Sequence, residues 1–399
     1  MCKTILIGLS ITLFIINIRW LKKSSYILES RSILQWDKYN ILYTSHDRNK
    51  IHSLNDTKEF KHHAQNSSNL AKIKYKRINY TDPEVCGEVC DLNIHGYPTK
   101  FWPFIIKNID CPLMMKKLTK TIKTEWPPPK QPPIEMYDDF TMFGRMPLDK
   151  NLWYFQEKYL GNMKSTPITK EEIQFKITAR ALRWKMSTYG IVEEDLLQAA
   201  LIKYSQGVQD KIGLDFGSSD PWITSIALLN GASKMYMFDY IKTVSLDDEI
   251  ETLTQLQLYR IWHQQLTIMD ENKLRESSLT RSKKGRKNHS LMFDFAISFS
   301  SIEHSGLGRF GDPLNPYGDL EAMAQMWCVM KPGAILFLNV PFHQNGSSLV
   351  WNAHRIYGYN RLQHLTANWK ILQEFNSCQL TNGLMCDGGF AVLWVLERV

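Results

Sequence analysis

Short apolar runs and longer amphipathic segments alternate along the second half of the chain. The apolar runs are typical of buried strands because they are short, rich in β-branched or aromatic residues, and bounded by turn residues. They lie at residues 211–216 (KIGLDF), 234–239 (KMYMFD), 293–298 (FDFAIS), 334–340 (AILFLNV) and 390–396 (FAVLWVL). Strands separated by helices predict a mostly parallel α/β sheet that helices cover on both faces.

The segments before and between these runs have helical patterns. Helices are predicted at residues 171–189, 193–204, 221–230, 247–263 and 320–330. Gly190 would cap the first of them at its C-terminus, and Pro221 stands in a first turn, where its missing N–H costs nothing. Residues 271–289 predict a charged insertion. Residues 331–334 (KPGA) predict a tight turn before the fourth apolar run.

The part of the chain before residue 136 divides into three predicted segments. Residues 1–23 hold an apolar stretch followed by basic residues, which predicts an uncleaved signal-anchor, with a cleaved signal peptide as the alternative. Residues 24–80 are polar and predict a disordered stem. Residues 81–135 predict a cysteine-containing cap and a stiff proline-rich linker, because proline removes donors and fixes φ. The α/β domain would then span residues 136–399.

Two signals on membrane orientation conflict. Positive charge follows the apolar stretch, which favours a cytoplasmic C-terminal domain. Sequons of the form N-x-S/T, which suit a lumenal chain, occur at Asn55, Asn66, Asn79, Asn288 and Asn345. Six cysteines lie outside the anchor, an even number that permits lumenal disulfides, and no set of them has convincing metal-ligand spacing. We predict a single-pass membrane glycoprotein of the endoplasmic reticulum or Golgi with a lumenal C-terminal domain.

The net charge is +8, and it changes this picture little. Much of the basic charge lies in local runs such as Lys72–Arg77 and Arg281–Lys287, which are typical of solvated linkers. Neither a recognition helix nor an aromatic-plus-basic module of an RNA-binding kind accompanies these runs. The expected partners are therefore a membrane and an acceptor substrate of unknown identity, and no nucleic acid.

Candidate ligand-binding residues follow two of the predicted strands. In a parallel sheet, ligands bind beyond the carboxyl ends of the strands. The turn from Asp215 through Gly217 to Ser219 consists of small residues and leads into a helix N-terminus, whose free N–H groups can face a ligand. Asp239 ends the second run, 24 residues after Asp215. That spacing is close to the about 20 residues typical of a carboxylate that binds ribose hydroxyls, although Asp239 would also serve as a helix N-cap.

The series LDFGSS, FDY, FDFAISFSSIEH and WCVMKPGAILFLNVP resembles the ordered motifs of class I S-adenosylmethionine-dependent methyltransferases. More specifically, residues 136–145 (MYDDFTMFGR), 300–323 and 352–358 (NAHRIYG) resemble the family named Caenorhabditis protein of unknown function, domain of unknown function 268. The resemblance covers about residues 136–399 and does not extend to the stem or anchor. It implies a Rossmann-like fold and S-adenosylmethionine as the cofactor.

Carried over by motif, the resemblance implies a cofactor loop formed by Asp215, Gly217 and Ser219. It implies that Asp239 contacts the ribose and that the stretch beginning at Ser300 lines the methyl-donor side. The chain departs from the pattern D-x-G-x-G-x-G, because only the first glycine is kept. Asp220 also places negative charge where the cofactor's carboxylate would lie, and the third strand has no distinct counterpart.

Polar residues are dense after the third and fourth apolar runs. A histidine that titrates near neutral pH can act as general base for a methyl acceptor, and an arginine can bind an anion bidentately. The alternative is that these groups cap helices and brace a long loop through salt bridges. The catalytic candidates are His304, Glu303 and His354, and the substrate-binding candidates are Arg309, Asp312, Asn352 and Arg355.

Three functions remain open from the sequence. The first is a membrane-anchored methyltransferase, and the second is a non-catalytic binding or scaffold protein that retains the fold. The third is a lumenal glycosyltransferase, for which Asp138-Asp139 or Asp247-Asp248 would bind metal and sugar nucleotide. Neither acidic pair follows a predicted strand, so the glycosyltransferase ranks last and no metal site is expected.

Overall fold

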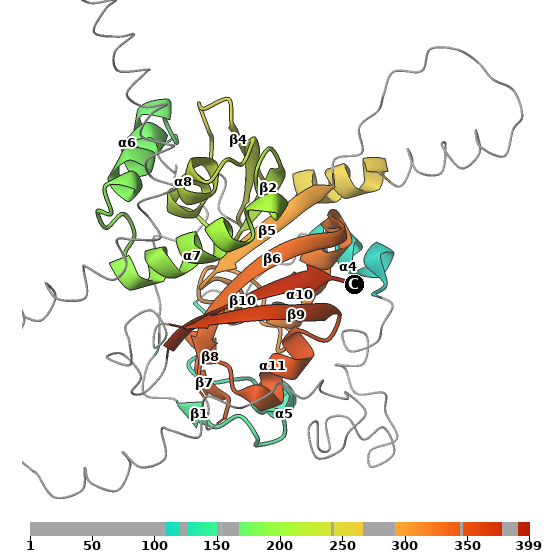
Figure 1. The fold of residues 1–399 in the computed structure, drawn as a ribbon. Coiled ribbons are helices and arrows are strands. Elements are labelled where there is room, and N and C mark those ends of the chain that lie inside the picture. Colours follow the sequence, from blue (N-terminus) through green and yellow to red (C-terminus); the bar gives the residue numbers. More distant parts are fainter. Residues whose placement is uncertain are drawn as a thin grey trace, which may run out of the picture. The chain divides into compact units, whose positions relative to one another are not determined.

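A seven-stranded sheet forms the centre of the fold, with the strand order β4-β3-β2-β5-β6-β10-β9 (Figure 1). The first five strands in this order pair in parallel, whereas β10 is antiparallel to both β6 and β9. The predicted α/β class with a mostly parallel sheet is therefore confirmed. The strands are β2 (Ile212–Phe216), β3 (Lys234–Phe238), β4 (Ile250–Leu253), β5 (Phe293–Phe299), β6 (Met330–Phe342), β9 (Trp369–Asn376) and β10 (Phe390–Arg398).

The structure is a computed structural model that describes only part of the sequence. The described residues are 109–119, 127–149, 153, 167–240, 243–265, 292–343, 346–376 and 390–399. The predicted anchor, stem and charged insertion lie outside these ranges, as do all five sequons. In the part that is described, no helix combines the length and the apolar character needed to cross a bilayer.

The chain order along the sheet reverses at β2. From this strand the chain proceeds outward to β3 and β4 on one side, and then returns to β5 and β6 on the other. Asp215 pairs with Met237 of β3 and with Ile297 of β5, so it lies on an interior strand, one residue before the end of that strand. In open parallel sheets such a reversal opens a crevice beyond the carboxyl ends of the strands, where ligands bind.

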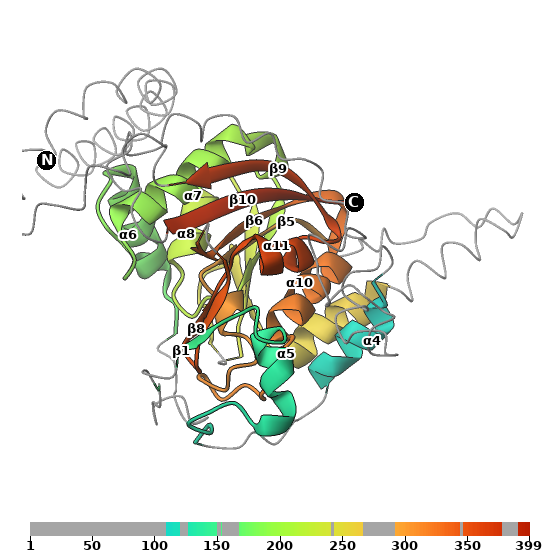
Figure 2. The same ribbon diagram turned by 90° about the horizontal axis from the view of Figure 1, so that it is seen from below.

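Two apolar cores lie on opposite faces of the sheet because successive side chains of a strand point to opposite sides. Leu214 and Phe216 of β2 belong to the core under α10 (Gly318–Val329) and α11 (Tyr359–Leu365). Phe295 and Ile297 of β5 belong to the core under α7 (Ile191–Lys203) and α8 (Trp222–Leu229). Figure 2 shows the two groups of helices with the sheet between them. Helices thus cover both faces, as predicted.

Two predicted helices are wrong in part. The first, at 171–189, is α6 (Lys170–Ala181), after which the chain leaves the helix through Arg183 at φ +58. Gly190 is accordingly the N-cap of α7, with extended backbone, and not a C-cap. The second, at 247–263, begins instead with β4, and residues 255–265 are helical. Pairing with β3 and burial of Ile250 and Leu253 favour the strand, because β structure depends on context more than on local propensity.

A smaller sheet lies beside the strand ends of the large one. It consists of β1 (Leu148–Asp149), β7 (Ser348–Val350) and β8 (His354–Ile356), none of which the sequence pattern predicted. β1 follows η4 (Ile134–Met136) and α5 (Tyr137–Thr141), whose Phe140 packs edge-on against Trp351 at 5.2 Å between ring centroids. The residues around β8 are therefore held in place by the segment 134–149.

The segment before residue 134 also packs on the domain. The indole N–H of Trp351 donates to the Pro129 carbonyl at 2.9 Å, and Pro128 is buried, so this proline-rich stretch is docked and not a free linker. Earlier still, α4 (Cys111–Lys116) and η3 (Lys117–Thr119) contribute three buried side chains to the core under α10. A disulfide joins Cys111 to Cys328 of α10, with 5.5 Å between their Cα atoms. The predicted boundary at residue 136 stays a prediction.

Candidate functional site

The loops that follow β2, β3 and β5 meet at the carboxyl end of the sheet. Gly217 has φ +95, and its N–H donates to the Phe238 carbonyl at 2.7 Å. A Cβ on Gly217 would collide with the Ser301 hydroxyl, so only glycine fits here. The Ser298 hydroxyl also donates to the Phe216 carbonyl at 3.2 Å. The three strand ends thus meet at the crevice that opens where the strand order reverses.

Asp215 lies buried at the base of this crevice. One of its carboxylate oxygens accepts a hydrogen bond from the Thr224 hydroxyl of α8 at 2.9 Å. Burial raises the pKa of Asp215 to about 7, because the charged form loses its solvation. Asp239 adds to the effect, since its negative charge lies close enough to oppose ionisation of Asp215. The two predicted cofactor-binding carboxylates are therefore neighbours.

Asp239 lines a small cleft together with Ser218, Thr252 and Thr254. Carboxylate and hydroxyl groups are suited to ribose hydroxyls, so the chemistry of this cleft fits the predicted cofactor. Its cavity volume, however, is about 10 Å³. Ligand pockets usually measure about 300–1,000 Å³, so rim side chains must move before S-adenosylmethionine fits.

The N-terminus of α8 is not fully free to bind an anion. The Trp222 N–H is already bonded to the Asp220 carboxylate at 3.0 Å, and Asp220 forms an ion pair with Lys176 of α6 at 2.9 Å. Ser219 is exposed beside it. The chain's own carboxylate therefore uses one of the N–H groups that a cofactor anion would otherwise meet.

Glu303 is the buried acid on the other side of the crevice. It lies in η7 (Ile302–His304), directly after β5, and its Oε1 accepts from the Ser300 hydroxyl at 2.6 Å. Oε2 is also buried and has no hydrogen-bond partner within the described part of the chain. Burial raises the pKa of Glu303 to about 7. An acid of this pKa with an unpaired oxygen can accept a proton near neutral pH.

His304 differs from the histidine that the sequence led us to expect. Its Nδ1 lies 2.6 Å from the Ala353 carbonyl, and because a carbonyl only accepts, Nδ1 carries the proton. Burial lowers the pKa of His304 to about 3, so the ring is neutral at pH 7 and is a weak base. Burial and the nearby Arg309 also lower the pKa of His354, whose ring centroid lies 6.2 Å from that of His304. Glu303, and not His304, is the group that titrates near neutral pH.

Two of the four predicted substrate-binding residues brace the loop at 302–316, and a third, close in the sequence to Arg355, is buried. Arg355 is buried and donates to four carbonyls, among them that of Ser305 at 2.6 Å. Asp312 is buried and accepts from the Gly306 N–H at 2.6 Å. Asn352 is fully buried at φ +46. Arg355 and Asp312 thus form hydrogen bonds with backbone groups of the loop, as in the alternative that these residues brace it, and their binding of substrate stays a prediction.

Arg309 remains at the rim of the site. It is partly exposed, its guanidinium donates to the Ala353 carbonyl at 3.2 Å, and it stacks over the Phe310 ring at 5.1 Å. His304 and Glu303 both experience its positive charge. Among the predicted substrate-binding residues, Arg309 is therefore the one whose position suits an anionic group of a ligand.

Sequence reasoning missed Tyr189. Its hydroxyl donates to the Ser300 carbonyl at 3.3 Å, and its ring packs against Trp222 and Phe299 at centroid distances of 5.9 and 5.7 Å. The segment was predicted to be helical, which would have placed Tyr189 on a helix and away from the strand ends. The basic and aromatic residues between Arg183 and Gly190, which break the apolar period of α6, are the signal that could have revealed the turn.

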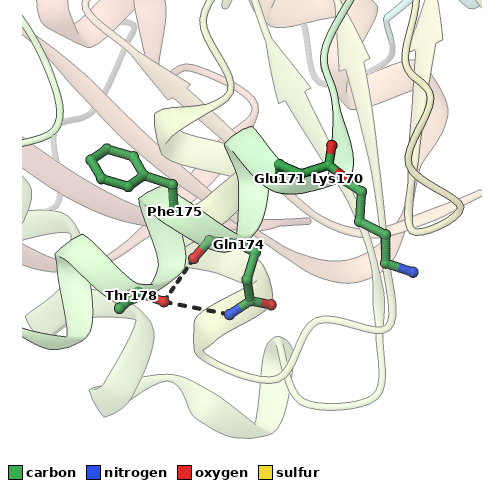
Figure 3. A pocket seen from close by; sticks show the side chains of 5 residues that line it. All are labelled: Lys170, Glu171, Gln174, Phe175 and Thr178. Atoms are coloured by element: carbon green, nitrogen blue, oxygen red, sulfur yellow. Dashed lines mark hydrogen bonds between the residues drawn. The ribbon is translucent and has the colours of Figure 1, made fainter.

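The remaining candidates lie elsewhere. Asp138 and Asp139 form the first turn of α5, and the Asp247 carboxylate accepts from the Glu249 N–H at 2.8 Å before β4 begins. A cavity of about 490 Å³ lies against α6, but all five side chains that line it come from that one helix (Figure 3). Among the described residues, no cluster of three histidine, cysteine or acidic side chains could bind a metal ion.

Comparisons with known proteins found one matching family model and a set of solved structures with low sequence identity. Residues 249–382 match the family model described as Caenorhabditis protein of unknown function, DUF268. No curated protein matches the chain.

Solved structures with similar folds include 1,6-didemethyltoxoflavin-N1-methyltransferase from Burkholderia thailandensis with bound S-adenosylhomocysteine. It is 12% identical with a TM-score of 0.35, over 57% of this chain and 86% of that chain. N-methyltransferase NodS from Bradyrhizobium japonicum WM9 is 11% identical with a TM-score of 0.31, over 57% and 97%. The [4+2]-cyclase SpnF is 12% identical with a TM-score of 0.30, over 58% and 97%. Likenesses of this size concern the fold and leave the activity open.

Proposed function

We propose that this protein binds S-adenosylmethionine at the ends of β2 and β3 and transfers its methyl group to an acceptor held beside Glu303. The observation that carries the proposal is the meeting of three strand-end loops, at Gly217, Asp239 and Ser301, where the strand order reverses. The antiparallel β10, inserted between β6 and β9, supports the class I methyltransferase type as well. The acceptor's identity stays open.

Residues on one side of the crevice would bind the cofactor, and residues on the other side would bind and deprotonate the acceptor. Asp239 would accept hydrogen bonds from the ribose hydroxyls of the cofactor, with Ser218 beside it. When bound, the cofactor supplies an electrophilic methyl group. Glu303, ionised in about half of the molecules near pH 7, would take the proton that the acceptor's O–H or N–H group loses. Arg309 would hold an anionic substituent of the acceptor.

Asp239→Asn is expected to weaken S-adenosylmethionine binding by about tenfold or more, because hydrogen bonds to a charged group contribute about 1.5–3 kcal/mol each. The measurement is isothermal titration calorimetry on the full chain in detergent. The matched control is Asp248→Asn, which removes the same charge from an exposed position before β4. It is expected to change the dissociation constant less than about twofold. Absence of binding heat for folded wild type would refute the proposal.

The second candidate function is a non-catalytic binding protein that retains the fold. Two observations favour it, namely the closed cleft beside Asp239 and the bond between Asp220 and the Trp222 N–H. This candidate predicts neither binding heat nor a change in melting temperature with S-adenosylmethionine. The calorimetric titration therefore separates the two functions directly.

We further propose that residues 1–23 anchor the chain in the membrane of the endoplasmic reticulum or Golgi, with the domain in the lumen. The disulfide between Cys111 and Cys328 supports this, since disulfides persist in oxidising compartments. Asn288 or Asn345 is then expected to carry glycan. Peptide mapping of the protein from cells, after enzymatic deglycosylation, would detect conversion of either asparagine to aspartate. An unmodified Asn288 and Asn345 together with free thiols at Cys111 and Cys328 would contradict the lumenal placement.

A further inference from the structure

Tyr189 lies in a segment that α7 holds against the strand ends. The buried Glu194 carboxylate of α7 accepts from the Met186 N–H at 2.8 Å and from the Ser187 N–H at 2.6 Å. Asp195, one residue further, forms an ion pair with Arg183 at 2.6 Å. These contacts fix the backbone on the N-terminal side of Tyr189, and α7 begins directly after it. The backbone that leads into Tyr189 is thus held by α7, while the Tyr189 side chain itself is 43% exposed.

Ser300 is the residue that Tyr189 reaches. Ser300 has φ +45, a left-handed conformation that costs a non-glycine residue about 1–3 kcal/mol and persists only where neighbours hold it. Two hydrogen bonds to residues outside this loop hold Ser300 in the left-handed conformation. Its N–H donates to the Asn339 carbonyl of β6 at 2.9 Å, and its carbonyl accepts from the Tyr189 hydroxyl at 3.3 Å.

The same conformation aims the Ser300 hydroxyl at Glu303. The hydroxyl donates to Glu303 Oε1 at 2.6 Å. A hydroxyl that donates to a carboxylate favours its ionised form, so this bond opposes the effect of burial on Glu303. The chain of contacts therefore runs from the Tyr189 hydroxyl through the backbone of Ser300 to the acid that faces the crevice.

We propose that Tyr189 is a positioning residue for Glu303 and acts through the backbone of Ser300. The inference rests on the proposed role of Glu303 as proton acceptor. Tyr189 holds the left-handed turn at Ser300, and the turn keeps the Ser300 hydroxyl on Oε1. Oε2, which is buried without a partner among the described residues, is left available to the acceptor's proton.

The other charged and titratable groups that face Glu303 come from η7 itself and from other elements. Arg309 of the loop after η7 and Arg355 of β8 favour its ionised form. His304 Nε2 lies 3.6 Å from Oε1, and Tyr357 is close enough for its own pKa to respond to Glu303. None of these groups bonds to Tyr189 or Ser300 in the described contacts. Glu303 and Arg309 also act electrostatically on the Tyr189 hydroxyl, but the raised pKa of Tyr189 keeps this hydroxyl uncharged near neutral pH, so its removal is expected to reach Glu303 through Ser300.

Tyr189→Phe is expected to raise the titration midpoint of Glu303 by about half a pH unit or more, because the Ser300 hydroxyl is no longer held on the carboxylate. The experiment is carbon NMR of the full chain with carboxyl-labelled glutamate, with the Glu303 signal assigned from Glu303→Gln. The matched control is Tyr204→Phe, which removes a hydroxyl that also donates across 3.3 Å, but to Gln373. The control is expected to leave the Glu303 midpoint unchanged.

Ser300→Ala is expected to raise the titration midpoint of Glu303 at least as far as Tyr189→Phe does. In the double variant, which carries both substitutions, Glu303 is expected to titrate as it does in Ser300→Ala alone. Residues that act through one another give such non-additive effects. An unchanged midpoint in Tyr189→Phe, or additive shifts in the double variant, would overturn the inference. The titration needs neither cofactor nor acceptor, so this result stays distinct from a failure of S-adenosylmethionine to bind.

Discussion

Asp319→Asn is expected to lower the free energy of unfolding by about 3–5 kcal/mol, because it leaves two buried guanidinium groups without their counter-charge. Asp319 is fully buried at the start of α10 and accepts from Arg361 at 2.7 and 2.8 Å and from the Tyr357 hydroxyl at 3.0 Å. Arg355 lies 3.8 Å away, and both arginines are themselves buried. Asparagine has the same shape but cannot neutralise them.

The pH dependence of stability should change in the same variant. Burial alone disfavours the charge of Asp319, but Arg355 and Arg361 outweigh it and lower the pKa to about 2 from an ordinary value of 3.8. A carboxylate with a lowered pKa stabilises the fold above its unfolded pKa and loses that contribution as the pH falls through its folded pKa. The difference between wild type and Asp319→Asn is therefore expected to be full at pH 5–8 and to shrink between about pH 4 and 2.

Chemical denaturation of the full chain at pH 7 measures the effect. The matched control is Glu397→Gln, which breaks the exposed ion pair with Lys370 at 2.8 Å and is expected to cost less than about 1 kcal/mol. A loss below about 1 kcal/mol for Asp319→Asn would show that water or rearranged side chains neutralise the two arginines. The loop at 302–316 would then not depend on this ion cluster.

The centre of the fold was predictable because its strands are buried on both faces. β2, β3 and β5 need apolar side chains toward both cores, so each appears in the sequence as a mostly apolar run, broken in β2 by Asp215 and in β5 by Asp294 and Ser298. Their predicted ends agree with the structure to within one residue. The strand ends, and with them Gly217 and Asp239, could therefore be placed at one edge of the sheet without any structure.

The edge strands could not be predicted for the same reason. β4 buries Ile250 and Leu253 but exposes Glu251, and β9 is partly exposed along most of its length. Such strands form because a neighbouring strand offers its N–H and C=O groups, and for β9 that neighbour is β10, which follows only after residues 377–389. The local pattern favoured a helix over 247–263. Residues 250–253 instead form β4, because they pair with β3.

The sequence alone could not predict which way the polar side chains at the site point. Arg309 and Arg355 carry the same guanidinium group and each follows a predicted strand, yet Arg355 is buried and only Arg309 is partly exposed. The loop at 302–316 contains many backbone groups that are buried and must be paired, and Arg355 and Asp312 pair them. Whether a polar residue serves the loop or the ligand depends on how the loop closes, which no local pattern records.

The disulfide between Cys111 and Cys328 predicts the second large loss of stability. It closes a loop of 217 residues, and in the chain-entropy model a cross-link over so long a loop contributes about 5 kcal/mol, with about 2–5 kcal/mol found when native disulfides are removed. The bond also holds α4 on α10, where Met114, Met115 and Leu118 are buried and Lys117 pairs with Glu321. Without the covalent link, these contacts must hold the segment by themselves.

Cys111→Ser is therefore expected to lower the melting temperature of the full chain by about 5–10 °C and the free energy of unfolding by about 2–5 kcal/mol. Dithiothreitol should lower the melting temperature of wild type toward that of the variant. Other cysteines lie outside the described residues, so the variant's own response to dithiothreitol measures what they contribute.

Lys117→Gln is the matched control, because it breaks the neighbouring ion pair to Glu321 and leaves the covalent link intact. Its expected cost is less than about 1 kcal/mol, since this pair is partly exposed. Equal melting temperatures of oxidised wild type and Cys111→Ser would contradict the prediction and show that packing of α4 on α10 suffices. A large loss in Cys111→Ser with a small one in Lys117→Gln would instead establish that the segment before the proline-rich stretch is stabilised chiefly by its covalent bond to α10.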